Sequence, residues 1–207
     1  MLVERFDEPW PHLIIDDFVD EITFKHLLSY FDDFNEESNR WRKRQIYKWN
    51  ELDAIQDKII FNIISNVRKI WDTYYLELSQ GVDERELVDN VIFETVRTKP
   101  MVITESYQSS AHPDSRMKLM SMVYYISENG AGTSLHNLDG YIHHTLEWKQ
   151  NRLFVFVRQQ TGDGITLHSK NTNTQFYRDT INLSVCQDKS NYNTVSRIDP
   201  SIKRKEK

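Results

Sequence analysis

Two short sets of residues could bind a metal ion together: His112-Pro113-Asp114 and, more than fifty positions later, His168, which Arg178 follows after ten more. Two imidazoles and one carboxylate can occupy one face of an octahedral ferrous ion and leave the opposite positions open. An oxygenase needs those positions for a co-substrate and dioxygen. Alternate residues of a strand point to the same side, so His112 and Asp114 can reach one ion if this segment is extended. The intervening proline excludes a continuing helix, and His168 must come from a second strand lying alongside.

The elements that must position these residues begin with helices. The segment Pro11–Phe18 predicts a short strand, and Asp20 is a candidate N-cap for a helix that runs to Phe31. From Glu51 to about Leu78, apolar residues recur at intervals of three and four, which predicts a longer helix with one apolar stripe. Such a stripe usually packs against a sheet.

After Gly81 the pattern changes to short extended runs separated by turns. The runs are Asn90–Arg97, Met101–Gln108, Lys118–Ser127, Arg152–Arg158, Gly164–His168 and Arg178–Val185. Glu128–Gly132 and Gly162–Gly164 are predicted turns, and Asn137–Thr145 is predicted to be an exposed loop. Helices followed by strands predict an α+β fold with an antiparallel sandwich or jelly roll.

The last run predicts an unusual interior. Arg178, Thr180, Asn182 and Ser184 alternate with a row that is mostly apolar. A polar inner row does not suit the core of a plain sandwich. It suits a barrel whose interior holds a charged ligand.

Composition limits the classes of protein that fit. A chain of 207 residues suits one domain, with a helical support over about 20–80 and a jelly-roll core over about 90–190. The formal charge of −5 and a basic cluster placed only in the tail, Lys203–Lys205, predict no nucleic-acid partner. Cys186 is the only cysteine, so no disulfide forms within the chain. No signal peptide or membrane-spanning run is evident, and we expect a soluble cytoplasmic protein without a membrane partner.

These residues resemble the Fe(II)- and 2-oxoglutarate-dependent oxygenases, particularly the prolyl-4-hydroxylase-like branch and its small phage-encoded relatives. The resemblance is carried by the opening Pro9–Phe18, the His112 and Asp114 pair, the strand Met122–Ser127, the turn Gly130–Thr133, the strand Asn151–Phe156, His168 and Arg178. It implies a double-stranded β-helix, a distorted jelly roll, with N-terminal supporting helices and iron near one open end. If this protein is phage-encoded, the compartment is the host cytoplasm.

The resemblance also implies roles for single residues. His112, Asp114 and His168 would hold Fe(II), and Arg178 would take the distal carboxylate of 2-oxoglutarate through its planar fork. Tyr125 matches a family tyrosine that hydrogen-bonds the same carboxylate. The expected reaction consumes dioxygen, converts 2-oxoglutarate to succinate, and hydroxylates an aliphatic carbon of a peptide side chain, with proline a candidate, or of a free amino acid. Ascorbate is a further candidate cofactor.

The chain departs from the family pattern around the substrate pocket. Many relatives carry tryptophan or serine just before the distal histidine, where this chain has Gly164–Leu167, and the usual double glycine with an acidic residue is loosened at Gly130–Thr133. Substrate specificity is expected in the loops Ser106–Ala111 and Asn137–Thr145.

Ordinary structural roles remain open for the same residues. His112 could cap a turn, Arg178 could form a surface ion pair, and Tyr125 could be a core aromatic. The other histidines are not expected to bind the metal: His136, His143 and His144 are expected to be solvated in a polar loop, where they could line a substrate entrance, and His12 and His26 are expected to be structural.

Two further functions compete with the oxygenase. One is a jelly-roll binding or assembly protein that keeps the site without turnover, since a fold does not imply a function. The other is nucleic-acid demethylation, which lacks the basic face that its substrate requires. No oligomeric state is predicted.

Overall fold

Ten strands form two antiparallel sheets in the computed structural model, which describes residues 1–31, 40–99, 111–115, 117–158, 166–170 and 176–188. The larger sheet has seven strands in the order β1-β2-β8-β5-β10-β4-β3, and the smaller has the order β7-β6-β9. The strands are β1 (Leu2–Phe6), β2 (His12–Asp16), β3 (Arg40–Lys48), β4 (Val88–Thr98), β5 (Lys118–Tyr125), β6 (Thr133–His136), β7 (Ile142–Thr145), β8 (Arg152–Val157), β9 (Leu167–Lys170) and β10 (Arg178–Gln187). The helices are α1 (Glu21–Leu28) and α2 (Lys58–Leu78), with 3-10 turns at Ser29–Phe31, Trp49–Ala54 and Arg85–Leu87.

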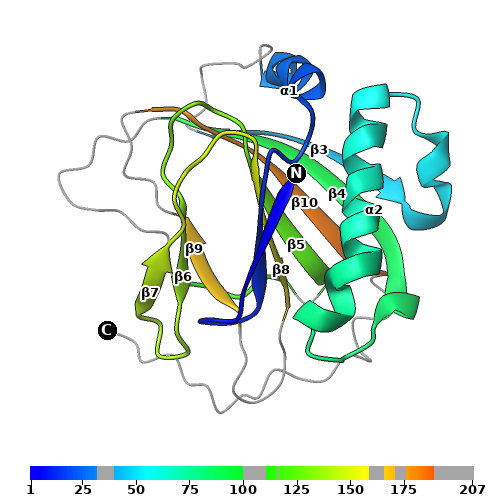
Figure 1. Ribbon diagram of the computed structural model, residues 1–207. Coiled ribbons are helices and arrows are strands. Elements are labelled where there is room, and N and C mark those ends of the chain that lie inside the picture. Colours follow the sequence, from blue (N-terminus) through cyan, green and yellow to red (C-terminus); the bar gives the residue numbers. More distant parts are fainter. Residues whose placement is uncertain (32–39, 100–110, 116, 159–165, 171–175, 189–207) are drawn as a thin grey trace.

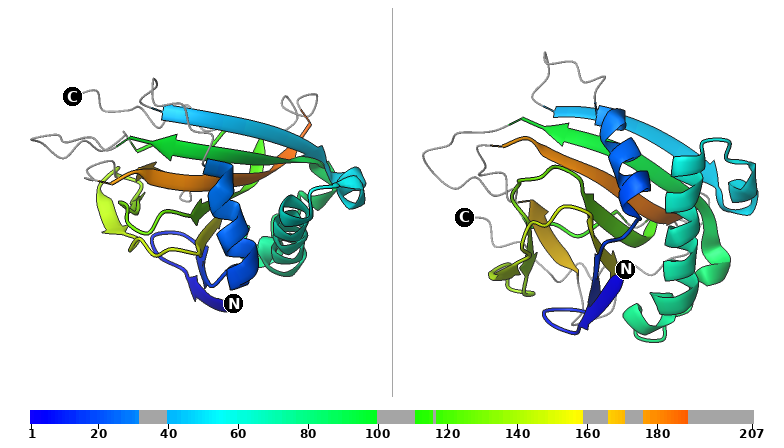
Figure 2. Two further views of the ribbon diagram at one scale, coloured as in Figure 1. Left: turned by 90° about the horizontal axis from the view of Figure 1, so that it is seen from above. Right: turned by 45° about the horizontal axis from the view of Figure 1, so that its top comes forward.

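The two sheets and the helices form layers (Figure 1). The seven-stranded sheet curves, with α1 and α2 against one face and the small sheet of β6, β7 and β9 on the other side, as the turned views of Figure 2 show. The concave face therefore lies between the two sheets.

Helix α2 follows the predicted apolar stripe. Ile63, Val67, Ile70 and Trp71 are all at most 2% exposed and face the large sheet. The predicted start at Glu51 is wrong, because Asp57 caps the helix by accepting hydrogen bonds from the amides of the first two isoleucines, Ile59 and Ile60. This cap satisfies amides that have no partner inside the helix. The preceding residues form a 3-10 turn instead.

Strand β8 shows how one sheet builds two cores. Leu153, Val155 and Val157 pack into the cluster beneath the helices, whereas Phe154 and Phe156 pack into the cluster between the sheets. Successive side chains of a strand point to opposite faces, so a continuous apolar run is what a strand buried on both sides requires.

Most predicted elements are confirmed. Asp20 caps α1 through a 2.9 Å hydrogen bond from the amide of Thr23, and strands were correctly expected in the regions of β2, β4, β5, β8 and β10. The prediction of a loop over Asn137–Thr145 is wrong in its second half, which forms β7. Strands β1 and β3 were not expected. The predicted strand Met101–Gln108 and the predicted turn Gly162–Gly164 lie outside the described residues. The predicted strand Gly164–His168 is described only from residue 166, and its last two residues begin β9.

Three members of the predicted polar inner row of β10 are buried: Arg178, Thr180 and Ser184 are at most 3% exposed. The fourth, Asn182, is only partly buried. Among the residues that the structure places, no helix is long and apolar enough to cross a membrane.

Candidate metal and co-substrate site

The structure brings His112 and His168 side by side. The two residues form an antiparallel bridge in which each backbone amide donates to the other carbonyl, at 3.1 and 3.3 Å. Their ring centroids are 4.8 Å apart. His168 is held on β9 by pairing with Leu135 of β6, and its ring lies 4.9 Å from that of Phe156. The expected alignment of two distant segments is therefore present.

Asp114 lies close enough to His168 for their charges to interact. The Asp114 side chain is 11% exposed, and its Oδ1 accepts a 2.9 Å hydrogen bond from Lys118 Nζ, with which it forms an ion pair. Burial acts to raise the pKa of the Asp114 carboxyl, but the charges of Lys118 and His168 outweigh it and hold that pKa below its usual value. Burial lowers the pKa of His168 to about 4, against the charge of Asp114. A neutral imidazole and a carboxylate are the protonation states that bind metals.

Two buried atoms of this group have no hydrogen-bond partner in the described part of the chain: Asp114 Oδ2 and His168 Nδ1. Leaving a buried polar atom unsatisfied costs about 1–3 kcal/mol, and a cation between them would satisfy both. Across the described ranges, no three His, Cys, Asp or Glu side chains already stand in a ligating arrangement. The residues thus fit Fe(II) in donor type, although the three side chains do not stand in a ligating arrangement in this structure.

A second buried group lies at the start of β10. Arg178 is 1% exposed, and its Nε donates to the Ala131 carbonyl at 3.1 Å. Tyr125 is fully buried, and its hydroxyl donates to Thr133 Oγ1 at 2.9 Å. Burial raises the pKa of Tyr125, and the charge of Arg178 offsets part of that rise. The surface ion pair considered for Arg178 is therefore wrong, because the Arg178 side chain is buried.

Trp148 completes this group, and sequence reasoning missed it. Its ring stacks on Tyr125 with centroids 4.3 Å apart and lies 5.4 Å from the Arg178 guanidinium carbon. A Cβ at Gly130 would lie 2.6 Å from the Trp148 ring, and one at Gly132 would lie 1.7 Å from the Leu146 carbonyl oxygen. These two glycines let the chain between β5 and β6 approach the connection that carries Trp148. In the sequence, the two glycines at Gly130 and Gly132 were the signal that another segment packs closely against this turn.

Thr180 of β10 lies beside the buried group formed by Arg178, Tyr125 and Trp148. It pairs with Tyr125 across β10 and β5, so both side chains are on the concave face. Thr180 is fully buried, and its Oγ1 has no hydrogen-bond partner in the parts of the chain that the structure describes. A hydroxyl in this setting is available to a polar ligand.

The predicted solvated histidines divide into two groups. His136 is buried, 4% exposed, and its ring contacts the Gly140 carbonyl at 2.9 Å and the Ser169 hydroxyl at 2.7 Å, so the prediction is wrong for this residue. It joins β6 to β9. His143 and His144 are partly exposed on β7.

A groove of about 940 Å³ lies elsewhere, between α1 and α2, and is lined by Phe24, Asn62 and Lys69 among others. It contains none of the predicted site residues. It also lies apart from the unsatisfied buried atoms of Asp114, His168 and Thr180.

Comparison with known proteins places this geometry in a structural class. No protein-family model matches the chain, and no curated protein matches its sequence. A prolyl-4-hydroxylase from Pseudomonas putida matches with a TM-score of 0.57 and 14% identity, over 86% of this chain and 92% of that one. A Trichoplax adhaerens prolyl hydroxylase, solved with a hypoxia inducible factor oxygen degradation domain peptide fragment, matches with a TM-score of 0.55 and 13% identity, over 90% and 87% of the chains.

A third structure is a dioxygenase for auxin oxidation from Arabidopsis thaliana in a binary complex with 2-oxoglutarate. It matches with a TM-score of 0.59 and 11% identity, over 88% of this chain and 85% of that one. The chain therefore has the fold of these oxygenases. At such identities the likeness extends to the fold alone.

Proposed function

We propose that this protein is an Fe(II)- and 2-oxoglutarate-dependent dioxygenase that hydroxylates an aliphatic carbon of a peptide side chain or a free amino acid. The observation that carries the proposal is the backbone bridge between His112 and His168, with Asp114 beside it, in a barrel that also buries Arg178. The shared fold supports the class. We also propose that the two facing sheets form a double-stranded β-helix and that residues 1–207 make one domain.

Each residue has a distinct task in this proposal. His112, Asp114 and His168 hold the ion, which when bound supplies the activation of dioxygen. Arg178 offers a planar fork for the distal carboxylate of 2-oxoglutarate. Tyr125 donates a hydrogen bond to the same carboxylate by turning its hydroxyl from Thr133, 2.9 Å away.

The surroundings of Arg178 favour an anion there. The guanidinium is fixed by the Ala131 carbonyl and lies over the face of Trp148, so its position is set before a ligand arrives. A preformed site loses less entropy on binding than a flexible one. The low local dielectric also strengthens attraction between opposite charges.

The test has a binding arm and a turnover arm. Anaerobic titration with Fe(II) should show one bound ion, lost in Asp114→Ala and in His168→Ala. With Fe(II), ascorbate and 2-oxoglutarate, succinate release should be slow alone and faster with a matching peptide or amino acid, and mass spectrometry should find one oxygen atom from dioxygen in the product. Wild-type iron occupancy and activity in Asp114→Ala would refute the ligand assignment. An iron-loaded protein that binds 2-oxoglutarate and never releases succinate would support the binding-protein alternative.

A further inference from the structure

Strand β3 is the most basic element of the chain. Its nine residues, Arg40–Lys48, include five lysines and arginines and no acidic residue, in a protein with a formal charge of −5. The expectation that the tail Lys203–Lys205 is the only dense basic cluster is therefore wrong. In the described residues, β3 is the last strand of the large sheet, next to β4.

The register places two of these arginines on the concave face. Arg42 pairs with Val96, which pairs with Thr180, which pairs with Tyr125. Residues directly opposite one another in a sheet share a face, so Arg42 is on the same face as Tyr125 of the candidate co-substrate site. Arg44, two residues on, shares this face as well.

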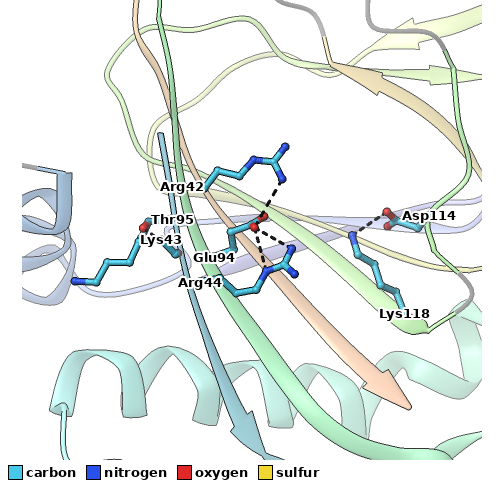
Figure 3. Close-up of polar contacts among 7 residues, drawn as sticks. All are labelled: Arg42, Lys43, Arg44, Glu94, Thr95, Asp114 and Lys118. Atoms are coloured by element: carbon cyan, nitrogen blue, oxygen red, sulfur yellow. Dashed lines mark hydrogen bonds and ion pairs between the residues drawn. The ribbon is translucent and has the colours of Figure 1, made fainter. Parts of the chain in front are cut away.

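The side-chain view agrees with the register. Figure 3 shows Arg42 and Arg44 extending from the side of the sheet where Asp114 and Lys118 lie, and Lys43 extending from the opposite side. Strand β3 therefore presents basic residues on both of its faces. Arg42 and Arg44 are on the face of the candidate site, and Lys43 is on the opposite face.

Glu94 of β4 contacts both arginines but can balance the charge of only one. Arg44 Nε and Nη2 lie 3.1 and 3.0 Å from Glu94 Oε1, and Arg42 Nη1 lies 3.9 Å from the same oxygen. The Glu94 side chain is 10% exposed, whereas those of Arg42 and Arg44 are 43% and 53% exposed. Two guanidinium groups share one carboxylate, which leaves one positive charge in excess beside the barrel.

The separation suits an extended chain. Three strand spacings of about 4.8 Å lie between Arg42 and Tyr125, or about 14 Å in all. An extended peptide rises about 3.3 Å per residue, so about four residues cover this distance. A peptide with one side chain near Tyr125 could therefore place a side chain about four residues away beside β3.

We propose that Arg42 and Arg44 bind a carboxylate side chain of an acidic peptide substrate, at a position separate from the hydroxylated residue. The proposal rests on the function proposed above and narrows its substrate to acidic peptides. The occupant is a peptide because one excess charge matches a single carboxylate. The buried Glu94 would repel a run of phosphates, and a nucleic acid needs several cationic contacts along its backbone.

The test uses ten-residue peptides labelled with fluorescein, each with a central proline among alanines and glycines and a single Glu moved along the chain. Matched peptides carry Gln at the same position. Binding to the Fe(II)- and 2-oxoglutarate-loaded protein is measured anaerobically by fluorescence anisotropy, so no turnover is needed. The Glu peptides with the correct spacing should bind about tenfold more tightly than their Gln partners, the range expected for hydrogen bonds to a charged group.

Variants on the two faces of β3 form the control. Arg42→Ala with Arg44→Ala should abolish the preference for Glu, and Lys43→Ala, which removes the same charge from the opposite face, should keep it. The double variant leaves the carboxylate of Glu94 without its arginine partners, which could disturb the strand. A second variant, Arg42→Glu, therefore keeps Arg44 and reverses one charge, and it should shift the binding preference toward peptides that carry Lys. Unchanged binding of 2-oxoglutarate reports that each variant is folded.

Three results would overturn the proposal. One is equal binding of Glu and Gln peptides at every position. Another is an equal loss of preference in Lys43→Ala and in the double variant, which would show a nonspecific charge effect. The third is tighter binding of a twelve-nucleotide single-stranded DNA that depends on Arg42 and Arg44. Failure of the wild-type protein to bind Fe(II) or 2-oxoglutarate would instead refute the proposed function. Binding of these two ligands is measured on the same samples, separately from peptide binding.

Discussion

Replacing Arg178 with methionine should uncouple 2-oxoglutarate binding from metal binding. Arg178 is 1% exposed, donates to the Ala131 carbonyl at 3.1 Å, and lies 5.4 Å from the Trp148 ring. Methionine keeps much of the side-chain length and fills the space beside Trp148 without a charge. The variant therefore removes the proposed anchor and leaves His112, Asp114 and His168 untouched.

The expected loss follows from the burial of this charge. Truncating one member of a buried charge pair costs about 2–5 kcal/mol, and each 1.4 kcal/mol is a factor of ten in affinity. The dissociation constant of 2-oxoglutarate should thus rise by about thirtyfold to several thousandfold in Arg178→Met. Arg178→Lys keeps the charge and loses the fork, so its loss should be smaller, about tenfold. The fold also loses the hydrogen bond to the Ala131 carbonyl, about 1.5–3 kcal/mol, and the interaction with Trp148, about 0.5–2 kcal/mol.

Calorimetric titration of the anaerobic, Fe(II)-loaded protein measures this effect directly. A matched ligand, 2-oxopentanoate, has the keto acid of 2-oxoglutarate without the distal carboxylate. Wild-type protein should prefer 2-oxoglutarate strongly, and Arg178→Met should bind the two ligands equally. Unchanged affinity for 2-oxoglutarate in Arg178→Met, with normal thermal stability, would refute the role of Arg178 and move the anchor elsewhere.

Three further predictions test other parts of the structure. Gly132→Ala should lower the free energy of unfolding by about 3 kcal/mol in urea denaturation, because the new methyl group would lie 1.7 Å from the Leu146 carbonyl oxygen. Lys118→Met should weaken Fe(II) binding about tenfold to a hundredfold in anaerobic titration without abolishing it, because Lys118 fixes Oδ1 of Asp114 and leaves Oδ2 for the ion; unchanged affinity would contradict this. Burial lowers the pKa of His12 from 6.5 to about 4, so the unfolded chain takes up the proton first, and stability that is complete above pH 6.5 is lost as the pH falls toward 4. His12→Phe should remove a loss on the order of 2 kcal/mol at pH 5, and equal losses in both proteins would refute it.

The sequence predicts those parts of the fold that depend on neighbouring residues. Asp20 caps α1 through residues three positions away, and the stripe of α2 is set by the period of the helix itself. The alternation from Arg178 onward likewise follows from the two faces of a strand. Each of these patterns is visible within a dozen residues.

The missed features depend on contacts between distant segments. Strand β3 has mostly polar side chains and exists because it pairs with β4, about fifty residues later. His136 is buried because Ser169 on β9 lies beside its ring, and Trp148 gains its place from Tyr125 and from two glycines in another connection. No local pattern contains these pairings, so periodicity alone could not predict them.

The unsatisfied atoms of the barrel suggest how stability and ligand binding are linked. Asp114 Oδ2, His168 Nδ1 and Thr180 Oγ1 are buried without hydrogen-bond partners in the described segments, and each such atom costs about 1–3 kcal/mol. A stable fold must offset that cost with its two apolar cores. A ligand that satisfies these atoms binds the folded chain and not the unfolded one, so it stabilises the fold in proportion to the logarithm of its concentration. A metal ion and 2-oxoglutarate should therefore raise the melting temperature together by more than either does alone, because each ligand satisfies buried atoms that the other leaves unsatisfied.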